Sequence, residues 1–238
     1  MKILAFDSSA KLASAAVTDG EKLLALYNID NGLTQSELLL PMIENLLKEL
    51  KLSFSDIELF AVSAGPGSFT GVRIGVALLK GLAFGKNLPC VSISTLEALA
   101  ENARGLKGII VPVMDARRSE FYNAIFKCDG KELSRITEDR AISASELAKE
   151  LSEFKEDVYL VGDGYDIAKR LLSEEGASLE ETPYLLRSQN AASIARLAYK
   201  KYLSGEALSD SEIMPTYLRL PQAERERLER EKREKGEI

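Results

Sequence analysis

Short apolar segments open the chain and are separated by turn residues. Residues 3–9, 14–20 and 22–29 are rich in Leu, Ile, Val and Ala, and an Asp-Gly pair stands between the last two. Runs of this length bounded by Asp, Ser and Gly are typical of strands, and an Asp-Gly pair is typical of a tight hairpin turn. The pattern therefore predicts a three-stranded antiparallel meander at the start of the fold.

The hydrophobic period then changes to that of a helix. Between residues 34 and 50, apolar side chains recur every three or four positions, and Thr34 and Glu37 have the spacing of a capping box. The rest of the first half predicts a strand, a helix, a strand and a helix, at residues 57–64, 70–84, 90–94 and 95–103. Three strands followed by helices that alternate with strands is the order of an RNase-H-like lobe, whose later strands need parallel crossovers.

The second half repeats this order in a weaker form. It predicts strands and helices at residues 108–116, 120–126, 132–138, 143–153, 158–164, 165–175 and 189–203. We therefore expect an α/β chain of two tandem RNase-H-like lobes, of which the second is degraded. The predicted divisions are residues 1–104 for the N-terminal lobe, 105–221 for the C-terminal lobe and 222–238 for a charged tail, with a hinge near 103–107.

Composition narrows the function. The 238 residues contain no histidine, which excludes a Ser-His-Asp triad, a Cys-His pair and a histidine-based zinc site. Hydrolases that depend on histidine are therefore excluded, and no catalytic residue or metal site is assigned to the chain. The formal net charge of −6 would repel a phosphate backbone. Any contact with RNA is thus expected to be indirect, through a partner.

No segment of the sequence is apolar for long enough to cross a membrane. The nearest candidate, residues 71–85, is interrupted by Arg73 and Lys80, and a span needs about 18 uninterrupted apolar residues. The first ten residues hold only a short apolar run that is broken by Asp7, unlike the core of a signal peptide. We expect a cytoplasmic protein without a membrane association.

A glycine-rich loop, SAGPGSFTGVRIG, stands between the strand at 57–64 and the helix at 70–84. Loops in this position often hold phosphate on bare backbone amides. This loop lacks the Lys of a P-loop, and its G-x-G-x-x-x-G spacing is one residue longer than a dinucleotide fingerprint. Two interpretations stay open, an anion contact and a tight turn that caps the helix. ATP or ADP is the one candidate cofactor, and a weak site for it would use Asp7, Gly65, Gly67, Gly162 and Gly164.

The helix at 70–84 is apolar nearly all round. Covering one face of a sheet needs a single apolar stripe of about 100°, so the second stripe requires another surface. The three consecutive leucines at 38–40 cannot all face inward. The glycines of the helix at 70–84 leave a groove in which a second helix could approach closely. We predict that a second copy or a related protein docks on these two helices; the alternative is that the helix at 34–50 of the same chain fills the groove itself. The predicted interface comprises Leu38, Leu39, Met42, Gly71, Arg73, Ile74, Gly75, Leu78 and Leu82.

Five sequence segments carry a resemblance to a known family: QSELLLPMI, AGPGSFTGVRIG, STLEALA, MDARRSEFY and PTYLR. In this order, over residues 1–221, they closely resemble the bacterial TsaB (YeaZ) family. The resemblance implies the ATPase-type fold of actin, Hsp70 and the sugar kinases. It also implies a part in making threonylcarbamoyladenosine at position 37 of tRNA, which no spacing in this chain could indicate.

The resemblance further implies a non-catalytic subunit. In the family, the N-terminal lobe docks on and activates a metal-bearing paralogue, TsaD, which transfers threonylcarbamoyl from its adenylate to N6 of the adenosine. The small ATPase TsaE joins this assembly, and the subunit alone forms a homodimer through the same surface. tRNA is then contacted only indirectly, through the complex.

The sequence departs from its relatives at two places. Gln35 stands where many members of the family have histidine, so that position does not need an imidazole. Kinase-type relatives follow the first-strand Asp with Gly and Thr or Ser, whereas Asp7 is followed by Ser-Ser-Ala-Lys. A stand-alone ATPase or small-molecule kinase therefore remains only an alternative, and a peptidase, without histidine, a remote one. Arg117 and Arg118 are interpreted as a solvated turn or, alternatively, as a contact to tRNA phosphate or a partner.

Overall fold

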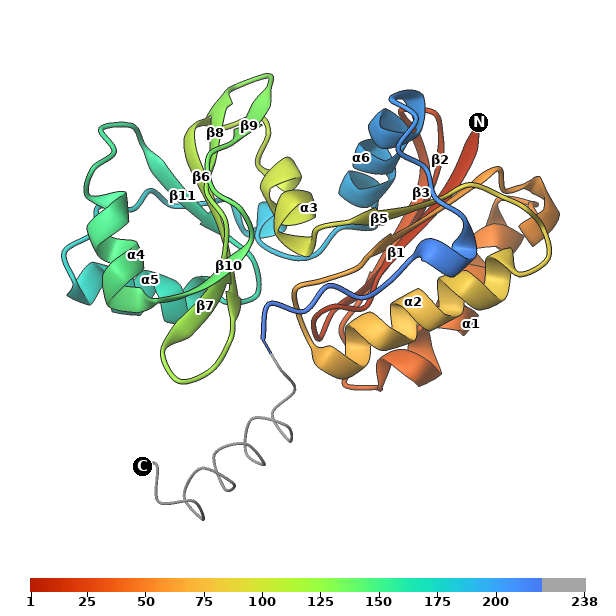
Figure 1. Cartoon of the computed structure of the whole chain (residues 1–238), viewed down its shortest axis with the longest axis horizontal. Coiled ribbons are helices and arrows are strands. Elements are labelled where there is room, and N and C mark those ends of the chain that lie inside the picture. The colour runs from red at the N-terminus through yellow and green to blue at the C-terminus, as the bar shows by residue number, and fades with distance from the viewer. Residues whose placement is uncertain (220–238) are drawn as a thin grey trace, which may run out of the picture.

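The N-terminal lobe is built on a five-stranded sheet (Figure 1). The protein is described by a computed structural model that covers residues 1–219. The strand order is β3 (Lys22–Ile29), β2 (Ala13–Asp19), β1 (Lys2–Asp7), β4 (Leu59–Ser63) and β5 (Cys90–Ile93). The first three strands are antiparallel, and β1, β4 and β5 are parallel. The predicted meander and its crossovers are confirmed.

Helices cover both faces of this sheet because its central strands are buried on both sides. Leu4 and Phe6 of β1 join one core with α1 (Gln35–Glu49) and α2 (Phe69–Ala83). Ile3 and Ala5 point to the opposite face and join a second core with α6 (Ala191–Leu203). The capping box predicted at Thr34 is present at the start of α1. The 3₁₀ helices η1 (Phe54–Asp56) and η3 (Asp210–Glu212) complete the lobe.

The C-terminal lobe repeats the first four strands in an interrupted form. Its strands are β6 (Lys107–Asp115), β7 (Glu120–Asn123), β8 (Phe126–Asp129), β9 (Leu133–Arg135), β10 (Arg140–Ser143) and β11 (Val158–Val161). β7 and β8 pair with β6 in one continuous register and so form a single broken strand. β11 is parallel to β6 on its other side. The counterpart of β5 is reduced to a single parallel bridge between Glu180 and Tyr159 of β11, which confirms a degraded repeat.

Three helices enclose the second sheet. α4 (Ala144–Leu151) and α5 (Tyr165–Glu174) share a core with one of its faces. The other face packs on α3 (Thr95–Asn102), which joins a core with β6, β8 and β11. The short helix η2 (Tyr184–Leu186) lies in the segment that leads to α6. Thus α3, which the sequence assigns to the first lobe, packs mainly between the two.

The division predicted at residue 104 agrees with the order of the strands along the chain but not with how the later segments pack. α6 and residues 207–217, which were assigned to the C-terminal lobe, pack on the N-terminal sheet and its helices. The Ser14 hydroxyl of β2 accepts a hydrogen bond of 2.7 Å from the Ala191 amide at the start of α6. The physical reason is that the second face of the N-terminal sheet is apolar and needs a helix to cover it. The predicted tail at 222–238 lies outside the described residues.

The helices of the described chain are short. None of those in residues 1–219 has the length and apolar character to cross a membrane. The longest, α1 and α2, have 15 residues each. Both lie along the same face of the N-terminal sheet, at the edge of the molecule (Figure 1).

Candidate docking face and interlobe cleft

The glycine loop packs against backbone from two other segments. Gly65 has a φ of 114°, and a Cβ placed there would lie 2.4 Å from the Thr216 carbonyl oxygen. A Cβ at Gly67 would lie 2.5 Å from the Ser9 carbonyl oxygen, which already accepts a hydrogen bond of 2.7 Å from the Ser68 amide. The Ser68 side chain caps α2 by accepting from the Gly71 amide. These contacts favour the tight-turn interpretation over a phosphate cradle.

The two glycines after β11 have the same role. A Cβ at Gly162 would lie 2.2 Å from the Val113 carbonyl oxygen, and one at Gly164 would lie 3.0 Å from it. Gly162 also has a φ of 111°, in the region that favours glycine. All four glycines predicted for a nucleotide therefore permit close approach of the chain to itself. Nucleotide binding stays a prediction, and these glycines do not support it.

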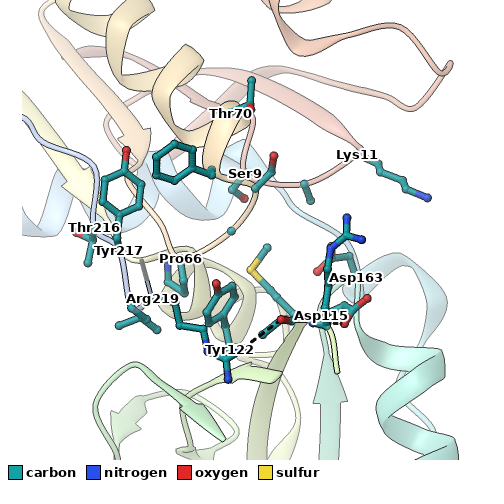
Figure 2. Close-up of a pocket in the computed structure, with 18 residues that line it drawn as sticks. Ser9, Lys11, Pro66, Thr70, Asp115, Tyr122, Asp163, Thr216, Tyr217 and Arg219 are labelled. Atoms are coloured by element: carbon teal, nitrogen blue, oxygen red, sulfur yellow. Dashed lines mark hydrogen bonds between the residues drawn. The ribbon is translucent and has the colours of Figure 1, made fainter. Parts of the chain in front are cut away.

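Carboxylates meet in the cleft between the lobes (Figure 2). Asp7 ends β1 and Asp115 ends β6, so the two residues hold corresponding positions in the two lobes. Asp7 is buried, which raises its pKa, and one of its oxygens accepts a hydrogen bond of 2.7 Å from the Ser9 amide. Asp163 lines the cleft with an exposed side chain, and partial desolvation by the surrounding walls first, and then the charges of Asp7 and Asp115, raise its pKa to about 6.

The cleft encloses about 550 Å³ and is lined by both lobes. Lys11, Arg117 and Arg219 stand on its walls along with Asp115 and Asp163. In residues 1–219, no group of three or more His, Cys, Asp or Glu side chains is placed to hold a metal ion. The cleft is thus polar and large enough for a small molecule.

The hairpin at Arg117 and Arg118 is a tight turn at the lip of this cleft. The Asp115 carboxylate accepts a hydrogen bond of 2.7 Å from the Arg117 amide. Arg117, Arg118 and Ser119 all have φ values between 57° and 65°, which non-glycine residues seldom adopt. The backbone of this segment therefore fits its interpretation as a tight turn. Sequence reasoning missed Asp163, although its VGDG context places it directly after a buried strand.

Five of the nine residues predicted for the interface lie in the core of their own lobe. Leu38, Leu39 and Met42 are buried between α1 and the sheet. A Cβ at Gly71 would lie 2.0 Å from the Ser8 carbonyl oxygen, and one at Gly75 would lie 2.5 Å from the Ser8 hydroxyl. The prediction of a glycine groove open to a partner was wrong, because the chain turns under α2 immediately after β1 and fills that groove.

The other four predicted residues are not fully buried. Arg73 is exposed, and Ile74, Leu78 and Leu82 on α2 are half-buried, the last two with part of their side chains packed against the core of the lobe. Two further apolar residues, which sequence reasoning did not assign to the interface, extend this surface: Leu40 on α1 is 37% exposed and Phe84 at the end of α2 is 81% exposed. We call Leu40, Ile74, Leu78, Leu82 and Phe84 the docking face. Leu40 is the third of the consecutive leucines, which was the signal that could have found it.

Gln35 has a structural role at the position where many relatives carry histidine. Its side-chain amide donates hydrogen bonds of 2.9 Å to the carbonyl oxygens of Ala10 and Lys11. These bonds tie the start of α1 to the loop that follows β1. An amide suffices for this contact, since the two acceptors need only a donor.

Comparison with known proteins places this fold and sequence in a family. The family model for TsaD, tRNA N6-adenosine threonylcarbamoyltransferase, matches residues 34–227. The tRNA threonylcarbamoyladenosine biosynthesis protein TsaB of Escherichia coli (strain K12) is 30% identical, over 92% of this chain and 95% of the relative. The chain belongs to the TsaB (YeaZ) branch of the TsaD family. The resemblance of its sequence segments to that family is confirmed.

Other TsaB relatives match over nearly the whole chain. The protein of Bacillus subtilis (strain 168) with the same name is 29% identical, over 98% of this chain and all of the relative. The solved structure of YeaZ from Pseudomonas aeruginosa has a TM-score of 0.74 and 26% sequence identity, and the match covers 91% of this chain and 99% of that chain. The two-lobe α/β architecture is thus that of TsaB, and membership links the chain to threonylcarbamoyladenosine biosynthesis.

Proposed function

We propose that this chain is a non-catalytic subunit of the complex that makes threonylcarbamoyladenosine at position 37 of tRNA. It docks on a TsaD-type paralogue through the docking face and stabilises the active conformation of that paralogue. The paralogue transfers threonylcarbamoyl from its adenylate to N6 of the adenosine. The observation that carries the proposal is the set of apolar side chains on α1 and α2 that keep exposed surface, from the partly buried Leu78 and Leu82 to the exposed Leu40 and Phe84.

The chemistry of the docking face supports a protein partner. A side chain as apolar as Phe84 is 81% exposed, and Leu78 and Leu82 lie on the same helix. Contiguous apolar side chains rimmed by charges are typical of interface centres. The rim is charged here, because Arg73 lies on α2 and Glu44 is exposed on α1. A stable interface on this face would bury about 1,200–2,000 Å² in total.

The same face supports self-association of the free subunit. Acidic Glu44 lies on α1 and basic Arg73 lies on α2. In a two-fold dimer each copy presents both helices, so the Glu44 carboxylate of one copy can face the Arg73 guanidinium of the other. We propose that the homodimer and the complex with the paralogue use one surface and therefore exclude each other.

A non-catalytic role is supported by the composition of the chain and by the cleft. The sequence has no histidine, and within residues 1–219 no group of three or more His, Cys, Asp or Glu side chains is placed to hold a metal ion. The net charge of −6 disfavours direct binding of tRNA. We propose that tRNA and the TsaE ATPase meet this subunit only within the assembly, and that the subunit acts by thermodynamic linkage, favouring one state of its partner.

Reconstitution tests the proposal. The purified chain is mixed with the TsaD paralogue, TsaE, ATP, threonylcarbamoyl-adenylate and unmodified tRNA, and the modified nucleoside is quantified. Modification is expected with the wild type and is expected to be lost with Leu78→Asp. Leu23→Asp is the matched control, since Leu23 is 46% exposed on β3, outside the docking face. Equal modification without this subunit would refute the proposal.

A further inference from the structure

The last described segment joins the two lobes across the mouth of the cleft. We call residues 213–219 the strap. At its first end, Ile213 is fully buried in the core that contains α1 and α2. The Thr216 amide then donates a hydrogen bond of 2.7 Å to the Ala64 carbonyl oxygen in the glycine loop. The strap is therefore anchored on the N-terminal lobe beside α2.

The other end of the strap is anchored on the C-terminal lobe. The Arg219 guanidinium donates a hydrogen bond of 3.3 Å to the Ala116 carbonyl oxygen and forms a salt bridge with Glu120. Both partners belong to the hairpin between β6 and β7. Figure 2 shows Thr216, Tyr217 and Arg219 along one side of the cleft, with Asp115 and Asp163 on the opposite side. The strap thus connects the lobes at the side of the cleft away from these carboxylates.

The strap also contacts the first turns of α2. The ring centroids of Tyr217 and Phe69 are 4.8 Å apart. The Arg73 guanidinium carbon lies 3.7 Å from the centroid of the Phe69 ring, and the Arg73 Nε donates a hydrogen bond of 2.8 Å to the Tyr217 hydroxyl. Arg73 therefore links the outward side of α2 to the strap through a stack of two rings and a cation.

The strap carries exposed apolar side chains of its own. Met214 is 63% exposed and Tyr217 is 42% exposed. The ammonium of Lys80, which lies between Leu78 and Leu82 on α2, is 3.7 Å from the Met214 sulfur and donates to the Ser211 carbonyl oxygen at 3.1 Å. The strap therefore lies against the helix that carries most of the docking face, and the charged side chains of Lys80 and Arg73 make the contacts between them.

We propose that the partner docked on the docking face also covers Met214 and Tyr217, and that this contact fixes the orientation of the two lobes through the strap. The inference rests on the proposed function, and its occupant is the same TsaD-type partner, because the strap lies against α2, the helix that carries Ile74, Leu78 and Leu82 of the docking face. A partner that contacts the strap binds best when the strap is in one position. By linkage, its binding then favours the lobe arrangement that this position permits.

Affinity tests the contact. The partner is titrated into the wild-type chain, Met214→Asp and Leu203→Asp, the last being a matched control at the end of α6 that is 67% exposed. We expect Met214→Asp to weaken binding at least tenfold and Leu203→Asp to leave it unchanged. If the wild type does not bind the partner, the proposed function fails and this inference fails with it. If the wild type and Met214→Asp bind equally well, this inference alone is wrong.

The distance between the lobes tests the coupling. Spin labels are placed on Glu21→Cys in the N-terminal lobe and Glu153→Cys in the C-terminal lobe, both exposed positions. The native thiols do not compete for the label, since Cys90 and Cys128 are buried and burial raises the pKa of Cys90 to about 11. The distribution of distances is measured by pulsed EPR with and without saturating partner.

We expect the partner to narrow the distance distribution in the chain with an intact strap. Arg219→Ala, which removes the anchor on the C-terminal lobe, is expected to bind the partner and to lose the narrowing. Arg170→Ala is the control, because Arg170 is exposed on α5 and does not line the cleft. The coupling is wrong if the partner leaves the distribution unchanged, or if Arg219→Ala responds as the wild type does.

Discussion

Gly71→Ala is expected to destabilise the N-terminal lobe, although alanine is the better helix former. Gly71 lies in the first turn of α2, and a Cβ there would stand 2.0 Å from the Ser8 carbonyl oxygen. Ser8 cannot withdraw freely, because its hydroxyl donates a hydrogen bond of 2.8 Å to the Gly71 carbonyl oxygen. Either the loop after β1 or the start of α2 must therefore move.

The size of the effect follows from two opposing contributions. Replacing glycine by alanine in a helix stabilises it by roughly 0.5–1 kcal/mol. Overpacking costs about 1–3 kcal/mol, and backbone rather than a flexible side chain blocks the new methyl here, which favours the upper end. The net loss is about 2 kcal/mol. For a domain of this size, 1 kcal/mol shifts the melting temperature by about 2–4 °C, so we expect a decrease of about 4–8 °C.

The matched control lies on the same helix. A Cβ at Gly81 meets nothing within 4 Å and would be exposed. Gly81→Ala should therefore keep the helix-forming gain and raise the melting temperature by about 1–4 °C. Thermal unfolding followed by circular dichroism measures both variants. If Gly71→Ala were as stable as the wild type, the inferred close contact between α2 and the loop after β1 would be wrong. Partner affinity of the folded Gly71→Ala protein should be unchanged.

Four further outcomes are expected. The pKa of Asp163 is about 6 in the folded chain and lower in the unfolded chain, so its negative charge destabilises the fold above that pH. Asp163→Asn should therefore stabilise the protein at pH 8, and this gain in stability should shrink as the pH falls from 6 to 4. Denaturant titrations at each pH measure the difference. Asp115→Asn should lower the Asp163 pKa in carboxyl NMR titrations. Light scattering should show a dimer for the wild type and Leu23→Asp and a monomer for Leu78→Asp. Calorimetry with Mg-ATP should show no micromolar binding; such binding, lost in Asp7→Ala, would instead support the ATPase alternative.

Much of the fold could be predicted because its signals are local. The capping box at Thr34 and the apolar period of residues 34–50 predict α1 within one residue at each end. Strand alternation and the Asp-Gly turn predict the meander in the same way. The repeat of this order in the second half predicts two lobes. The short strand β10 was missed, since four half-buried residues give no clear period.

The candidate surfaces were predicted less well. A helical wheel separates the faces of α2 but does not say which neighbour each face meets. Gly71 and Gly75 were therefore assigned to a partner, whereas Ser8 lies against both. The strap was not predicted at all, because Tyr217 gives no sign in the sequence that it contacts Arg73, 144 positions away. The family resemblance, in contrast, rests on contiguous segments and needs no contact information.

The sequence by itself determined the elements, the absence of histidine chemistry and the family, since periodicity, capping and composition are properties of neighbouring residues. Only the tertiary structure decided that α6 returns to the first lobe, where the Ala191 amide meets Ser14 across 177 positions. It also decided which apolar residues of α1 and α2 remain outside the core. Contacts between distant segments depend on the complete packing of both sheets, and burial is a property of that packing rather than of any one segment.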